Sequence, residues 1–249
     1  MRKLPPIKAV LHAFRSVAAY KSVGIQFSLA WTAILFVLGL VGLLTRSPGG
    51  GMPGDISPLD FLSIAVGLLA FCSIAVNWHR FVLLDEIPGA AKMLRLDAPV
   101  WRYIGNSLLI VLAAAVPILI LVEILAYLPP IASLLAVPAA IMAGTFALAL
   151  SLKLPAIALG RKDFGFKDAF AACQDNFWPL TGVFLINVTV ALAATFVLIV
   201  IASAVGRASP MLGELTGLCL SMVLNVFYTL FSVSILTSLY GFFVERRDF

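Results

Sequence analysis

The sequence predicts an all-α integral membrane protein: a polytopic bundle of six transmembrane helices with short amphipathic helices on the cytoplasmic side. Hydrophobic residues make up 62% of the 249 residues and charged residues only 12%. A soluble domain has about 45–50% apolar and about 25% charged residues. The apolar residues also gather in six runs, each close to the roughly 20 residues that cross a bilayer core as a helix. Residues 1–249 are therefore expected to form a single membrane domain.

The expected spans cover residues 23–44, 60–78, 105–128, 131–152, 179–203 and 215–240. Pro58 precedes the second span, and Pro129 and Pro130 make a tight turn after the third. Pro179 begins the fifth span, where its missing N–H costs nothing. About twenty residues of organised sequence precede the first span and no small-residue cleavage pattern follows it, so it is an uncleaved span rather than a signal peptide.

The basic residues fix the orientation of these spans. Of the 17 Lys and Arg residues, all but Arg46 and Arg207 fall on one side of the membrane when the chain is threaded through six times. Short basic loops stay cytoplasmic. Both termini are therefore expected in the cytoplasm, and the net charge of +5 faces an anionic leaflet. No basic-aromatic recognition module points to nucleic acid.

Three stretches outside the spans are expected to lie in the headgroup plane: residues 5–20, 97–104 and 164–177. In the first, apolar residues such as Ile7, Leu11 and Phe14 recur at three and four residues, while Lys8 and Arg15 fill the other face. His12 is expected on this wet face, fully solvated.

The third interfacial stretch repeats the pattern, with Phe166 and Phe170 opposite Lys167. In the second, Asp97 is suited to cap a helix and Trp101 suits the interface. Interfacial helix, outward span, short turn and inward span then recur with a period of roughly 75–85 residues along the chain. A threefold helical-hairpin repeat is one interpretation; any bundle of hairpins with basic inner loops would look similar.

Three motifs resemble a known group of proteins: Trp78-His79-Arg80-Phe81, the stretch 154–160, and the run from Asp168 to Trp178. They are similar to uncharacterised six-span inner-membrane proteins of Gram-negative bacteria, which are distantly similar to the membrane domain attached to some glycerophosphodiester phosphodiesterases. The resemblance implies this topology and the bacterial cytoplasmic membrane. It implies no activity, because the spans use up the chain and leave no soluble phosphodiesterase barrel.

The candidate lipid- or partner-binding residues lie at the cytoplasmic ends of the spans and in the interfacial helices. They are Lys8, Arg15, His79, Arg80, Trp101, Arg102 and Lys167. Arg80 could grip a lipid phosphate while His79 donates a hydrogen bond or a proton. Alternatively, both side chains only anchor the helix end at the interface.

Three polar residues within the spans support a different hypothesis. Glu123 is the only acidic residue well inside an expected span, and such carboxylates are costly and often functional. Asn187 and Asn225 lie at membrane depth in the fifth and sixth spans. Together they could line a transport path. Otherwise Glu123 reaches toward the headgroups and the asparagines bond between helices.

Nothing in the sequence forms a chemical signature. The two histidines have no cysteine or carboxylate at ligand spacing, so no metal site, cofactor or catalytic residue is expected. The leading hypothesis is a non-enzymatic accessory or scaffold protein. Its expected partners are membrane lipids and another membrane complex or copies of itself, with no nucleic acid. The alternative is a small transporter or exporter using Glu123, Asn187 and Asn225.

Overall fold

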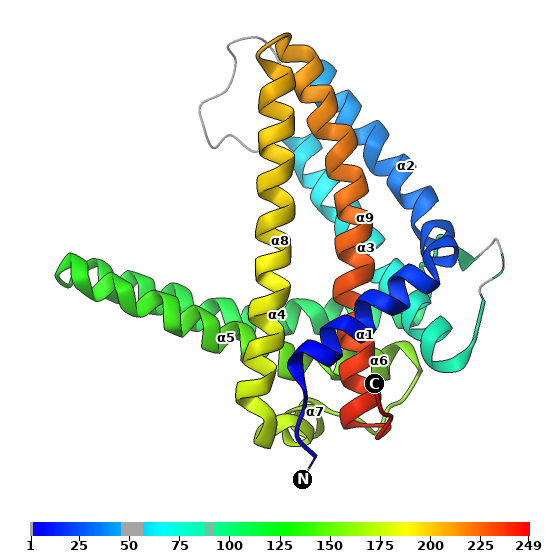
Figure 1. Ribbon diagram of the computed structural model, residues 1–249, viewed down its shortest axis with the longest axis vertical. Coiled ribbons are helices and arrows are strands. Elements are labelled where there is room, and N and C mark those ends of the chain that lie inside the picture. The colour runs from blue at the N-terminus through cyan, green and yellow to red at the C-terminus, as the bar shows by residue number, and fades with distance from the viewer. Residues whose placement is uncertain (1, 46–56, 88, 90–91) are drawn as a thin grey trace.

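The computed structural model describes residues 2–45, 57–87, 89 and 92–249; Arg46 and the rest of the glycine-rich loop to residue 56 lie outside this range. The described residues form helices and turns without a strand. In chain order the elements are α1 (Pro6–Ala19), α2 (Lys21–Thr45), α3 (Pro58–Leu84), α4 (Ala98–Ala126), the 3-10 helix η2 (Pro130–Leu135), α5 (Ala136–Ser151), α6 (Lys153–Ala158), α7 (Phe166–Cys173), η3 (Gln174–Asn176), α8 (Phe177–Gly206) and α9 (Pro210–Phe243) (Figure 1).

The predicted fold class is confirmed. Six helical stretches among the described residues are long and apolar enough to cross a membrane: α2, α3, α4, Pro130–Ala158, Phe166–Gly206 and α9. The chain is a multi-pass membrane protein. Local sequence fixes several helix ends. The Ser57 hydroxyl accepts from the backbone N–H of Asp60, and the Asp60 carboxylate accepts from that of Ser57, which starts α3 with Pro58 in its first turn.

Two expected elements differ from those observed. Residues 97–104 are not a separate interfacial helix but the first turns of α4, because nothing after Trp101 breaks the helix before Gly105. The fourth span is broken in two places: η2 gives way to α5 at its start, and α5 gives way to α6 at Leu152. Pro155 explains the second break, since it has no N–H to donate to the carbonyl of Ser151 and its ring would crowd that carbonyl.

The packed core lies at one end of the bundle. Helix α9 packs against α1, α2, α3 and α8. Its buried residues are concentrated between Thr229 and Phe242, whereas most of its first half is partly or fully exposed. Trp78, Tyr103 and Tyr240 are among the largest fully buried side chains. This is also the end where the chain termini lie, and we call it the terminal end (Figure 1).

The hairpin of α4 and α5 runs steeply across the direction of α8 and α9 and extends away from the other helices (Figure 1). Its base touches α8: Gly144 lies directly against the ring of Phe184, and the Thr145 hydroxyl donates a 3.2 Å hydrogen bond to that of Thr181. Helices α1 and α7 precede the first and third hairpins, but no separate helix precedes this second one. The three hairpins are therefore not equivalent, and the threefold repeat stays a prediction.

Candidate functional site

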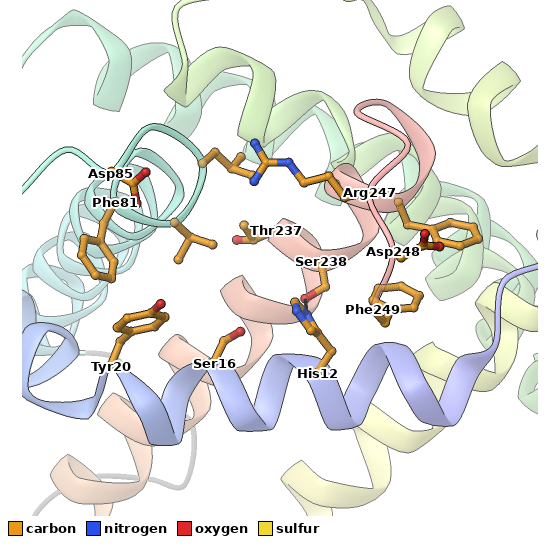
Figure 2. Close-up of a pocket in the computed structure, with 14 residues that line it drawn as sticks. His12, Ser16, Tyr20, Phe81, Asp85, Thr237, Ser238, Arg247, Asp248 and Phe249 are labelled. Carbon is orange, nitrogen blue, oxygen red and sulfur yellow. Dashed lines mark hydrogen bonds between the residues drawn. The ribbon is translucent and has the colours of Figure 1, made fainter.

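Helix α1 lies between an apolar groove and a polar cavity. The groove, of about 310 Å³, is lined by Ile7, Val10, Leu11 and Phe14 of α1, Ile186 and Val190 of α8, and Phe227 and Phe231 of α9. The cavity, of about 330 Å³, is lined by residues of α1, α3, α9 and the C-terminal segment: His12, Ser16, Tyr20, Phe81, Val82, Leu83, Asp85, Thr237, Ser238, Gly241, Phe242, Arg247, Asp248 and Phe249 (Figure 2).

Three faces of α1 explain this position. The small side chains of Ala9 and Ala13 are fully buried and let the helix approach α9 closely. Ile7 is 74% exposed and Phe14 48% exposed, so the apolar face points away from the bundle. Lys8 is exposed on a third face. The expected amphipathic helix is present, and in addition it buries a face against the protein.

The lengths of α8 and α9 give the depth that α1 would have in a membrane whose hydrocarbon begins at the helix ends remote from the termini. A helix crosses this layer in about 20 residues. Counted from Pro210, at the end of α9 remote from the termini, that length ends next to Phe231. Counted back from Gly206 in α8, it ends at Ile186. Both residues line the apolar groove, whereas Ser238 of α9, further along, lines the polar cavity. When α8 and α9 span a membrane, α1 therefore lies between hydrocarbon and headgroups.

The floor and ends of the polar cavity are held by side-chain contacts. His12 Nδ1 and Ser238 Oγ form a 2.9 Å hydrogen bond between α1 and α9. At one end, the rings of Tyr20 and Phe81 meet edge to face, with centroids 5.1 Å apart. At the other end, the Phe249 ring stacks on the buried Phe242 ring, also at 5.1 Å. The C-terminal residue thus forms one wall of the cavity.

His12 differs from its expected solvated state. It is half-buried in the cavity wall, and burial, followed by the nearby Arg15 guanidinium, lowers the pKa of its imidazole. The neutral ring is therefore favoured, and it can share one proton with Ser238 whichever nitrogen carries it. Periodicity placed His12 on the polar face of α1 correctly but gave no sign that α9 covers this face.

Charges line the rim of the cavity. Asp248 pairs with Arg2 from the N-terminal segment, and Arg247 Nε lies 2.7 Å from the carboxylate of Glu245. Asp85 follows the end of α3 in a left-handed conformation, with φ of 56°. Within the described part of the chain Asp85 forms no ion pair. The Arg247 side chain reaches across the cavity toward the end of α3, where Asp85 lies (Figure 2).

His79 and Arg80 do not reach the surface in the expected way. His79 is fully buried; its Nδ1 lies 2.8 Å from the Thr237 hydroxyl and its Nε2 lies 3.3 Å from that of Tyr103. It therefore joins α3, α9 and α4 inside the core and is inaccessible to a lipid or a partner. Aromatic and basic neighbours suggested an interface, but the first turns of α4 cover the imidazole.

Arg80 already has partners for its guanidinium. Its Nε donates to Glu86 Oε2 at 2.8 Å, and its Nη1 donates to the carbonyl of Ala158 in α6 at 2.9 Å. Only 21% of the side chain is exposed. The arginine therefore holds α3, the following turn and α6 together, and it is poorly placed to grip a phosphate.

A buried arginine that sequence reasoning missed lies nearby. Arg95 is 6% exposed; its backbone N–H donates to Ser73 Oγ at 3.0 Å, and its Nη1 to Asn77 Oδ1 at 3.3 Å. Its Nε also donates to Asp97 at 2.7 Å. The segment before α4 thus folds back along α3. In the sequence, the only sign that Arg95 has a partner is the carboxylate of Asp97, two residues after it.

The remaining surface candidates are accessible but dispersed. Lys8, Arg15, Trp101, Arg102 and Lys167 are all exposed. The cavity residues Tyr20, Asp85, Ser238 and Arg247 were not predicted, because nothing in the sequence shows that these four segments meet.

The transport candidates are not brought together. Glu123 is exposed near the tip of the α4–α5 hairpin, where it accepts a 3.3 Å hydrogen bond from Tyr127. Asn187 donates to the Tyr228 hydroxyl at 3.2 Å and lines a second cavity, of about 230 Å³, between α3, α4, α5, α6, α8 and α9. Asn225 is exposed. Glu123 lines neither this cavity nor the one beside α1.

Over the residues that the structure covers, no group of three or more His, Cys, Asp or Glu side chains is placed to hold a metal ion. Cys72 and Cys173 are buried and Cys219 is exposed, and all three are free thiols. No protein-family model, curated protein or solved structure matches this chain.

Proposed function

We propose that this multi-pass membrane protein is a non-enzymatic accessory or scaffold component of a bacterial cytoplasmic membrane. Its terminal end faces the cytoplasm, binds the headgroups of the inner leaflet and presents a surface to a partner membrane complex. The observation that carries the proposal is the position of α1, with an apolar groove on one flank and a polar cavity on the other. A helix with this environment is suited to the membrane interface.

The charges on this end support binding to an anionic leaflet. Lys8 and Arg15 are exposed on α1, and Lys167 is exposed at the start of α7. A Lys or Arg next to an anionic membrane surface contributes about 1 kcal/mol of attraction. Three such residues therefore give a useful bias toward anionic lipids without a dedicated pocket.

The basic residues next to the two termini support a cytoplasmic location of these termini. Arg2, Lys3, Arg246 and Arg247 all lie at the terminal end, whereas the short turn between α8 and α9 at the opposite end carries only Arg207. Basic residues near span ends resist translocation.

The experiment reverses the charges of α1 and α7 together. We expect Lys8→Glu/Arg15→Glu/Lys167→Glu to reduce the co-purification of anionic phospholipids and of partner proteins, measured by mass spectrometry after mild-detergent extraction. Arg207→Glu is the matched control, because it reverses one exposed charge at the opposite end and should leave both unchanged. Unchanged lipid and partner recovery in the triple variant would refute the proposal.

A further inference from the structure

We infer that the polar cavity beside α1 binds the zwitterionic headgroup of a phosphoethanolamine phospholipid. Asp85 takes the ammonium group, while the free end of the Arg247 guanidinium and the His12–Ser238 pair take the phosphate. The inference rests on the proposed function in one respect, which is that α1 lies in the headgroup layer. It goes beyond it by assigning a built site and a single headgroup class.

The first argument is the separation of opposite charges across the cavity. Asp85 has no ion pair among the residues that the structure describes, although Arg247 reaches toward it from the opposite wall. Arg247 Nε lies 2.7 Å from Glu245 Oε2, and no other ion pair of the Arg247 guanidinium is found among the described residues, so its Nη groups can donate to a ligand. A ligand that carries a cation and an anion a few bonds apart can pair with Asp85 and Arg247 at the same time. Carboxylate–ammonium and guanidinium–phosphate contacts are strong charge-assisted hydrogen bonds.

The second argument is the polar floor between these charges. His12 and Ser238 already face each other at 2.9 Å, and both line the cavity. Ser16 of α1 adds another hydroxyl to the wall. A phosphate diester offers acceptors to hydroxyl and imidazole donors, so this floor fits the bridging part of a headgroup.

The third argument is size and location. A cavity of about 330 Å³ lies at the lower end of the 300–1,000 Å³ range of small-molecule sites. It therefore holds a headgroup rather than a whole lipid. The acyl chains would stay outside the cavity. Tyr20 and Phe81 form the aromatic end of the cavity, as expected at a membrane interface.

The test titrates the full-length purified protein in detergent with three probes while intrinsic Trp fluorescence reports thermal stability. The probes are dihexanoyl phosphatidylethanolamine, dihexanoyl phosphatidylcholine and free O-phosphoethanolamine. We expect the ethanolamine lipid to bind at least about tenfold more tightly than the choline lipid, because a trimethylammonium cannot donate hydrogen bonds to Asp85. Equal affinity for the two lipids would overturn the headgroup assignment. If O-phosphoethanolamine binds as tightly as the ethanolamine lipid, the ligand is not specifically a phospholipid, and that part of the inference is refuted.

Two variants locate the site. Asp85→Asn removes the charge but keeps a residue that tolerates the left-handed conformation, so it should fold normally and lose the preference for ethanolamine. Arg247→Gln should weaken both phospholipids about equally. A wild-type lipid preference in Asp85→Asn, or wild-type affinities in Arg247→Gln, would refute the site.

The charge-reversed Lys8→Glu/Arg15→Glu variant separates this inference from the proposed function. It should lose anionic lipids and keep the ethanolamine preference, because neither side chain lines the cavity. If it keeps its anionic lipids, the proposed function fails and the titration still decides whether the headgroup site exists.

Discussion

The backbone N–H of Leu4 donates a 2.8 Å hydrogen bond to the side-chain oxygen of Asn176, and both residues are buried. The Asn176 amide returns the contact by donating to the carbonyl of Arg2 at 3.1 Å. Arg2 in turn pairs with Asp248 and donates to the carbonyls of Arg246 and Arg247. One asparagine before α8 therefore ties the first residues of the chain to the last, and with them the wall of the cavity beside α1.

We predict that Asn176→Ala destabilises the protein by about 1–3 kcal/mol, because it leaves the buried N–H of Leu4 without an acceptor. Thermal unfolding in detergent, followed by Trp fluorescence, measures the loss. Asn225→Ala is the matched control, since Asn225 is exposed and its side chain makes no hydrogen bond among the described residues. Equal stability of the two variants would contradict the structural role of Asn176.

A second prediction concerns the contact between the α4–α5 hairpin and α8. A Cβ atom on Gly144 would lie 2.1 Å from the Phe184 ring, far inside van der Waals contact. We expect Gly144→Ala to cost about 1–3 kcal/mol through overpacking. Adding Phe184→Ala should recover part of this loss, because it removes the obstructing ring.

Gly105→Ala is the control for this prediction. A Cβ there meets nothing within 4 Å, although Gly105 is also an interior residue of a helix. Alanine forms helices better than glycine, so no loss of stability is expected. A similar loss in both variants would show that the Gly144 effect does not come from Phe184.

The Arg80–Glu86 pair gives a prediction on pH. The hydrogen bond from Arg80, aided by the charges of Arg95 and Lys92, holds the pKa of Glu86 below its ordinary value of 4.5. A lowered folded-state pKa stabilises the protein above the unfolded-state value, and this contribution is lost as the pH falls through the folded-state pKa. The melting temperature should therefore fall on acidification below about pH 4.5, and Glu86→Gln should flatten that fall.

Asp163→Asn is the comparison for the pH experiment. Asp163 pairs with Arg161 and its pKa is also lowered, but its side chain is 71% exposed. Solvent screens such pairs, so the variant should keep the wild-type acid dependence. If Asp163→Asn flattens the profile and Glu86→Gln does not, the assignment to Glu86 is wrong.

Hydropathy and proline placement were enough to predict the six spans, because membrane helices satisfy their own backbone and need only a sufficient apolar length. The periodicity of residues 5–20 also predicted α1 to within a residue at each end. Interior breaks were harder to predict. Pro155 lies past the expected end of the fourth span at residue 152, and the apolar pattern alone does not show the break between α5 and α6.

The candidate site was largely out of reach of the sequence. Tyr20, Asp85, Ser238 and Arg247 come from four segments whose meeting depends on helix packing, and small-residue faces do not identify their partners. His79 illustrates the same limit. Its neighbours Trp78 and Arg80 suited an interface, but Thr237 and Tyr103 from distant helices bury it. One-dimensional patterns give the depth of a residue in the membrane, not its neighbours.

The last prediction concerns orientation. In a variant with the three native cysteines replaced by alanine, a cysteine at Lys162 should react with a membrane-impermeant maleimide only in inverted vesicles, because the basic terminal end is expected in the cytoplasm. A cysteine at Ala208 should react in intact cells, since it lies in the exposed turn between α8 and α9 at the opposite end. Both positions are exposed, so differences in labelling report the side of the membrane rather than burial. The reverse pattern would place the termini outside and would remove the inner-leaflet basis of both proposals.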